Sequence, residues 1–155
     1  MKRFTLQLMK ILRKYFAERG EEHTNNDEHN KELNMFITTF HYTFVHSSRA
    51  SQGEMYKSFN HLLGVPVETN ATAILFSDTV AAIEVEIPKF ASNNPPSLIP
   101  LPDNEFAHIT LWCAKKTAAF NSNMLPGEVK SNSAKRVVFK EPVALKGVFS
   151  FWYHE

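Results

Sequence analysis

The sequence predicts an α+β domain with a largely antiparallel sheet, and three observations support this class. Apolar runs of strand length follow one another along most of the chain, with little helix between them. One helical pattern begins at a Ser51 cap, runs to Leu63 and ends at Gly64. Two of the strands flank the short turn Ser77-Asp78-Thr79, as in a hairpin. The expected strands are 35–45, 67–76, 80–87, 106–114, 136–139 with its continuation, and 148–153.

The first 33 residues are expected to form a basic amphipathic helix and a polar connector. Apolar side chains fall on one face of residues 2–19, and Gly20 can end that helix. We interpret residues 1–33 as part of one domain that spans 1–155. The alternatives are a mitochondrial targeting presequence, because the first 17 residues are basic and contain no acid, or a helix at a membrane surface.

The composition of the chain indicates which classes of protein it can belong to. An apolar fraction of 43% and 13 Phe residues describe a packed globular chain, for which we expect a monomer. The single Cys113 excludes an intramolecular disulfide and a Cys-based zinc site, and it suits the reducing cytoplasm. No apolar run is long enough for a transmembrane segment. A net charge of +1 argues against a DNA duplex as partner and favours a small nucleotide or an RNA end.

Two tetrads carry the prediction of chemistry: His41-Tyr42-Thr43-Phe44 and His108-Ile109-Thr110-Leu111. Each has the form His, any residue, Thr, apolar residue, and each lies in an expected strand. Alternate residues of a strand share a face, so the His and Thr of each tetrad project together. Two such strands side by side would place two imidazoles and two hydroxyls around one small anion, without a metal. The alternative is a pair of ordinary strand histidines.

Other residues near the tetrads are candidates for substrate binding. An aromatic or imidazole ring beside the site could stack on a base, although core packing is the alternative for each. These candidates are Tyr42, His46, Phe106 and Trp112. The basic residues Lys115, Lys116, Lys135 and Arg136 could face RNA or only solvent.

The paired tetrads resemble the signature of the 2H phosphoesterase superfamily. Residues 106–114 are similar to the second motif region of the 2′,3′-cyclic nucleotide 3′-phosphodiesterase family, and Lys146-Gly147-Val148-Phe149 resembles its closing strand. Residues 120–126 resemble the cyclic phosphodiesterase domain of plant and fungal tRNA ligases. The chain departs from these relatives in lacking a P-loop and in having Phe106 where a basic residue precedes the second motif.

This resemblance implies a bilobal fold, with two mostly antiparallel sheets facing a central cleft and helices outside. It implies hydrolysis of 2′,3′-cyclic phosphates on nucleotides or RNA ends to 2′-phosphates, with no metal and no cofactor. The catalytic pair would be His41 as acid and His108 as base, with Thr43 and Thr110 holding the phosphate. The alternatives are cleavage of 2′,5′-oligoadenylate or a cyclic dinucleotide, and a non-catalytic RNA- or nucleotide-binding module.

Overall fold

The computed structural model describes residues 40–46, 48–91 and 104–151. The expected helix over 2–19 and the connector over 21–32 lie outside these residues. The inclusion of residues 1–33 in one domain with the rest of the chain therefore stays a prediction.

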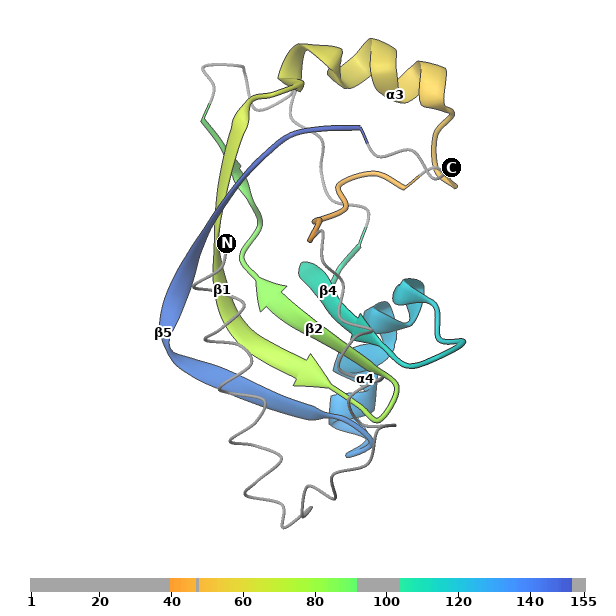
Figure 1. Ribbon diagram of the computed structural model, residues 1–155, viewed down its shortest axis with the longest axis vertical. Helices are drawn as coiled ribbons and strands as arrows, with labels where there is room; N and C mark the ends of the chain where they lie inside the picture. Colours follow the sequence, from red (N-terminus) through yellow and green to blue (C-terminus); the bar gives the residue numbers. More distant parts are fainter. Residues whose placement is uncertain (1–39, 47, 92–103, 152–155) are drawn as a thin grey trace. The chain divides into compact units, whose positions relative to one another are not determined.

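An antiparallel sheet forms the centre of the described structure (Figure 1). The order of its strands is β3-β1-β2-β4, and β5 pairs with β1. Each pairing between these described strands is antiparallel, and β1 and β2 form the expected hairpin. The expected α+β class is confirmed. The strands are β1 (Pro66–Phe76), β2 (Val80–Val85), β3 (Lys89–Phe90), β4 (His108–Cys113) and β5 (Lys135–Val148).

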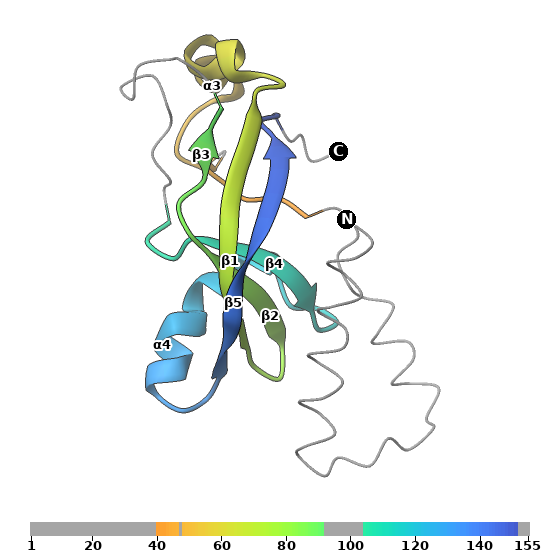
Figure 2. The ribbon, with the colours of Figure 1, turned by 90° about the vertical axis from the view of Figure 1, so that its left-hand side faces the viewer.

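The sheet is divided in two by an irregularity in β1. Ala71 pairs with Val143 of β5, whereas Ala73 pairs with Val138, so the register shifts between them. Such a bulge bends the strand that carries it and increases the local twist. Figure 1 shows β1 and β5 bending together, and Figure 2 shows the two strands side by side. The first half of β1 pairs with β3 and the second half with β2. The described strands therefore form one bent sheet, where two facing sheets were expected.

The end of the chain differs from expectation. Two strands were expected, 136–139 with its continuation and 148–153, but the structure has the single strand β5, which ends at Val148. The stretch Lys140-Glu141-Pro142 lies where the expected strand 136–139 continues, and it contains a proline, which cannot donate to a ladder. These residues fall within the register shift, where no ladder partner is required. Residues 149–151 are not in a strand, and 152–153 lie outside the described residues.

The expected helix after the first tetrad is confirmed as α3 (Gln52–Phe59), continued by the 3-10 turn η1 (Asn60–Leu62). Ser51 Oγ accepts a hydrogen bond from the Glu54 amide, and the Ser51 amide donates to the Glu54 carboxylate. This reciprocal cap fixes the start of the helix. Gly64 follows with a φ of 77°, a left-handed conformation that glycine adopts without strain.

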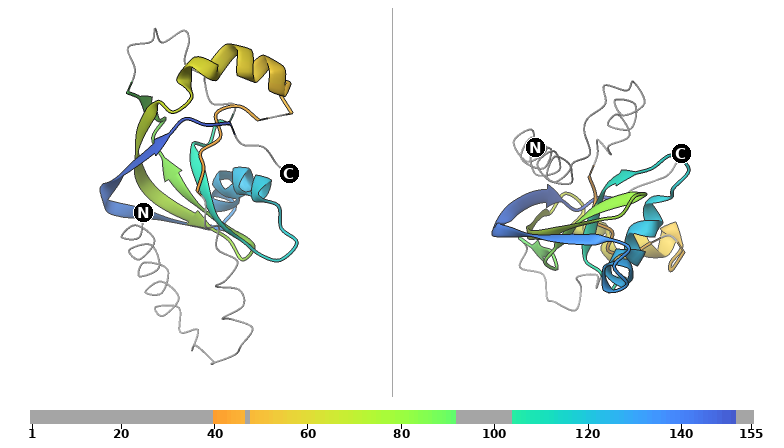
Figure 3. Two further views of the ribbon diagram at one scale, coloured as in Figure 1. Left: turned by 45° about the horizontal axis from the view of Figure 1, so that its top comes forward. Right: turned by 90° about the horizontal axis from the view of Figure 1, so that it is seen from below.

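Two short helical segments lie between β4 and β5. They are η3 (Ala119–Met124) and α4 (Leu125–Lys130). In Figure 3 they lie beside the half of the sheet that contains β2 and β4, and η3 contacts both strands. Leu125 is fully buried there in one hydrophobic cluster. The other buried members of that cluster are Ala73, Leu75, Val80, Ala82 and Ala134. Among the described helices, none is both long and apolar enough to cross a bilayer.

Candidate active site

The two tetrads lie side by side. Tyr42 forms an antiparallel bridge with Ile109, the second residue of the other tetrad. Antiparallel pairing at this point places His41 opposite Thr110 and Thr43 opposite His108, all four on the face away from Tyr42 and Ile109. Of the expected strand 35–45, residues 35–39 lie outside the described part. In the remainder, residues 40–45, the only strand-like pairing is the isolated bridge of Tyr42, and these residues do not form a continuous strand.

His108 is held at both ring nitrogens. Its Nδ1 lies 2.6 Å from the carbonyl oxygen of Phe106, and its Nε2 lies 2.8 Å from Ser122 Oγ. A carbonyl oxygen can only accept, so Nδ1 carries a hydrogen and donates it. Nε2 is therefore the nitrogen at which the ring gains or loses a proton.

The surroundings of His108 favour its neutral form. Burial of the ring lowers the pKa of His108, and the nearby His41 lowers it further, while the hydrogen bond to Phe106 acts in the opposite direction. The interaction with His41 places the two imidazoles within electrostatic reach of each other. A neutral imidazole with a defined Nε2 is the form that can accept a proton.

Ser122 is a residue that the sequence reasoning missed. It belongs to η3, is fully buried, and its Oγ lies 2.9 Å from Thr110 Oγ1 as well as 2.8 Å from His108 Nε2. It also donates a hydrogen bond to the Ala119 carbonyl at 2.6 Å. The His and Thr of the second tetrad thus converge on one oxygen atom. Nothing in the sequence beyond the resemblance of residues 120–126 to a known domain pointed to this serine.

Tyr42 lies on the other face of the first tetrad from His41 and Thr43, and His46 lies two residues beyond the tetrad. The Tyr42 ring contacts Phe44 edge-on at 4.9 Å, on the face opposite His41 and Thr43. Burial raises the pKa of Tyr42, and its hydroxyl is buried without a hydrogen-bond partner in the described part of the chain. His46 lies in a turn, where its Nδ1 accepts a hydrogen bond from the Ser48 amide. Tyr42 therefore packs on an aromatic cluster with Phe44, Phe90 and Phe149.

Of the two aromatic candidates beside the second tetrad, Phe106 adjoins the site and Trp112 does not. The Phe106 ring stacks on His108 with a centroid distance of 4.7 Å and an angle of 10°. Thr110 pairs with Ala82 of β2, but Trp112 pairs with the adjacent Ala81. Neighbouring residues of β2 face opposite sides, so this bulge turns Trp112 to the side away from Thr110. The simple alternation expected from the sequence is wrong at this position.

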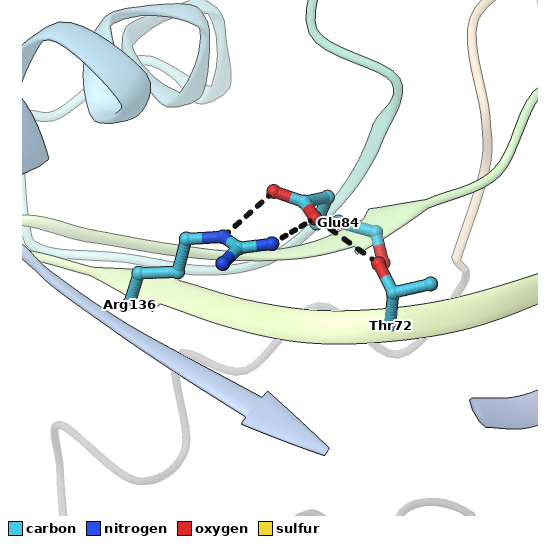
Figure 4. Close-up of polar contacts among 3 residues, drawn as sticks. All are labelled: Thr72, Glu84 and Arg136. Carbon is cyan, nitrogen blue, oxygen red and sulfur yellow. Dashed lines mark hydrogen bonds and ion pairs between the residues drawn. The ribbon is translucent and has the colours of Figure 1, made fainter. Parts of the chain in front are cut away.

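A polar triad borders the site on β2 (Figure 4). Glu84 pairs across the sheet with His108, yet its carboxylate binds Arg136 through two hydrogen bonds of 2.6 and 3.1 Å. Thr72 donates to the same carboxylate at 3.1 Å. The hydrogen bond from Arg136 is the largest cause that lowers the pKa of Glu84, and the Thr72 hydroxyl adds to it, while burial opposes both. Arg136, a candidate for facing RNA, is thus engaged with Glu84.

The lowered pKa of Glu84 predicts how the free energy of unfolding depends on pH. A carboxyl whose pKa is lowered in the folded state contributes stability that is present above its unfolded pKa and lost as the pH falls through the folded pKa. We expect urea denaturation to show a steeper loss of stability below about pH 4.5 in the wild type than in Arg136→Ala. The effect is modest because the pair is partly exposed to solvent. The control is Lys146→Ala, which removes the more exposed pair with Glu68; equal pH dependence in Arg136→Ala and the wild type would contradict the prediction.

The described residues contain no group of three or more His, Cys, Asp or Glu side chains that could hold a metal ion. The groups that gather at the tetrads are instead imidazoles and hydroxyls, which transfer protons and donate hydrogen bonds. The arrangement therefore suits acid–base chemistry on an oxyanion.

Comparison with known proteins shows that this chain is similar to parts of two larger proteins. The chain matches no family model. It is 27% identical over 112 residues to tRNA ligase 1 of Arabidopsis thaliana, a match that covers 72% of this chain and 10% of that protein. It also superposes on a crystal structure of a fungal RNA kinase with a TM-score of 0.57 and 20% identity, covering 86% of this chain and 41% of the other. The chain therefore spans about a tenth of the ligase and less than half of the kinase, and it shares its fold with part of the latter.

Proposed function

We propose that this chain is a 2H phosphoesterase that hydrolyses a 2′,3′-cyclic phosphate at an RNA end to a 2′-phosphate. The observation that carries the proposal is the bridge between Tyr42 and Ile109, which brings the two tetrads together on one face of the sheet. An RNA end, in preference to a free nucleotide, is supported by the names of the two similar proteins, a tRNA ligase and an RNA kinase.

The proposed reaction uses the two imidazoles as base and acid. His108 accepts a proton at Nε2 from water as the water oxygen bonds to phosphorus, and His41 donates a proton to the ribose 3′ oxygen as its bond to phosphorus breaks. The assignment of His108 as base is supported by its lowered pKa, because the shift favours the neutral ring, which is the form that accepts a proton. His41 is exposed to solvent, so it can exchange its proton between turnovers.

The two threonines would stabilise the negative charge that develops on the non-bridging oxygens of the phosphate. Thr43 lies opposite His108 and Thr110 lies opposite His41 through the Tyr42–Ile109 bridge, so each hydroxyl has an imidazole beside it. In the structure Nε2 of His108 is bonded to Ser122, which means that the attacking water has to exchange with this hydroxyl.

The deciding experiment is a panel of substrates incubated with the purified chain. The panel contains 2′,3′-cyclic AMP, a short RNA with a 2′,3′-cyclic phosphate, 2′,5′-oligoadenylate and cyclic dinucleotides. We expect the first two to be hydrolysed, with the 2′-phosphate as product and the RNA preferred. Cleavage of the 2′,5′ bond alone would favour the signal-cleaving alternative. Binding of every compound without turnover would favour the non-catalytic module.

Removal of metal ions tests the mechanism separately. Because two histidines supply both proton transfers in the proposed reaction, we expect unchanged hydrolysis of 2′,3′-cyclic AMP after dialysis against EDTA. The measurement is the initial rate before dialysis, after dialysis, and after Mg²⁺, Mn²⁺ or Zn²⁺ is added back. A rate that disappears with EDTA and returns with one metal would contradict the acid–base mechanism.

A further inference from the structure

We propose that Ser122 is a positioning residue that stabilises the protonated ring of His108 and so sets the proton affinity of that imidazole. The proposal rests on the proposed function only for the role of this proton in turnover. The hydrogen bonds themselves are features of the fold.

A count of hydrogens shows why Ser122 favours the protonated ring. Four close contacts link these groups: His108 Nδ1 to the Phe106 carbonyl, His108 Nε2 to Ser122 Oγ, Ser122 Oγ to Thr110 Oγ1, and Ser122 Oγ to the Ala119 carbonyl. Each contact needs one hydrogen between its two atoms. A neutral ring and two hydroxyls provide three hydrogens, whereas a protonated ring provides a fourth. All four contacts are hydrogen bonds only when His108 is protonated.

The direction of the serine hydroxyl follows from this count. When His108 is protonated, Nε2 donates to Ser122 Oγ, and the serine hydrogen points to the Ala119 carbonyl at 2.6 Å. When the ring is neutral, Nε2 needs a donor, and the serine hydrogen can turn to it. The hydroxyl therefore gives Nε2 a partner in both states, and the hydrogen bond is stronger in the charged one.

Because Ser122 is buried, water cannot readily take the place of its hydroxyl at His108 Nε2. Ser122 is fully buried and Thr110 is 9% exposed, so solvent is largely excluded from the contact at Nε2. Desolvation of the ring lowers the pKa of His108. In our proposal, a hydrogen bond donated by the charged ring to Ser122 Oγ, 2.8 Å from Nε2, opposes that effect. Among the described residues, the titratable groups that face the ring are His41 from the first tetrad and Glu84 from β2, whose carboxylate binds Arg136. The η3 segment carries no titratable side chain.

In the proposed reaction this arrangement would hold the proton that His108 takes from water. The new N–H bond forms at Nε2, and this hydrogen is donated to Ser122 Oγ until the ring returns the proton to solvent. Ser122 itself forms and breaks no covalent bond. Loss of its hydroxyl should therefore shift the pH dependence of the reaction in addition to lowering the rate.

The test is an NMR titration of the His108 ring in the wild type and in Ser122→Ala. We expect the variant to bind the Nε2 proton about tenfold more weakly, because a charge-assisted hydrogen bond is lost from a desolvated ring. The Nδ1 hydrogen should stay in place, since its acceptor at Phe106 is unchanged. The matched control is Ser131→Ala, which removes an exposed hydroxyl bonded to the Glu128 carbonyl.

The outcomes separate this proposal from the proposed function. The same His108 midpoint in Ser122→Ala and wild type would overturn the positioning role, whether or not the protein hydrolyses cyclic phosphates. A shifted midpoint in a protein without turnover would support the positioning role and count against the proposed function. If Ser122→Ala does not fold, Ser122→Cys keeps the volume with a weaker hydrogen-bonding group, and we expect its midpoint to fall in the same direction. In an active protein, the acidic limb of the kcat/KM profile should move by the same factor.

Discussion

Alanine at position 108 is expected to lower the rate of 2′,3′-cyclic AMP hydrolysis by on the order of 10²–10⁴, the usual contribution of one acid–base group. The reason is the loss of the Nε2 that accepts the proton of water. The ring is half-buried at the strand surface, between Phe106 and Ser122. The fold should survive, because His108 is not a member of the buried hydrophobic cluster around Leu125. Circular dichroism and kcat measured on the same preparation check both parts.

The same loss is expected for His41→Ala, because a ribose 3′ oxygen is a poor leaving group without a proton donor. The two variants differ in their surroundings, since His41 is exposed and His108 is not. The stability of His41→Ala should accordingly remain close to that of the wild type. His61→Ala is the matched control, because His61 is an exposed histidine of η1 outside both tetrads. Full activity in either tetrad variant would end the catalytic interpretation.

Removal of the tetrad hydroxyls is the second large effect that we expect. Thr110→Val keeps the shape of the side chain but leaves the phosphate oxygens without one donor. Losses of about 10²–10³ in kcat are typical when such a donor is removed. Thr43→Val should have a similar effect on kcat. The Ser variants keep the hydroxyl and should recover most of the activity.

The two threonine variants also separate chemistry from packing. Thr110 Oγ1 is bonded to the buried Ser122, so Thr110→Val should lose stability as well as activity. Thr69→Val is the control, since Thr69 lies on β1 outside both tetrads and its hydroxyl donates to the Glu86 carbonyl. Unfolding in urea and kcat for the three variants provide the comparison. A Thr110→Val protein with the kcat of the wild type would show that this hydroxyl does not contact the reacting phosphate.

Local sequence signals predicted much of the fold because they act over a few residues. Ser51 forms the expected cap, to which Glu54 adds a reciprocal hydrogen bond, and Gly64 lies where the helix was expected to end. The turn at residues 77–79 joins the expected hairpin of β1 and β2. The end of the chain was harder to predict, because a proline such as Pro142 interrupts a strand unless the strand bulges there, as β5 does between Val138 and Val143.

For the candidate site, the sequence by itself determined which residues share a strand face. His and Thr stand two apart in each tetrad, so each pair lies on one face of its segment. The four side chains gather at one site once the two tetrads lie side by side, and the Tyr42–Ile109 bridge brings the tetrads together in this way. The sequence could not determine which side chains from other helices and strands contact the site. Ser122 of η3 lies within hydrogen-bond distance of His108, and a bulge in β4 turns Trp112 away from Thr110. Arg136 forms a salt bridge with the Glu84 carboxylate. These contacts depend on strand register and on the packing of distant segments, which only the tertiary structure decides.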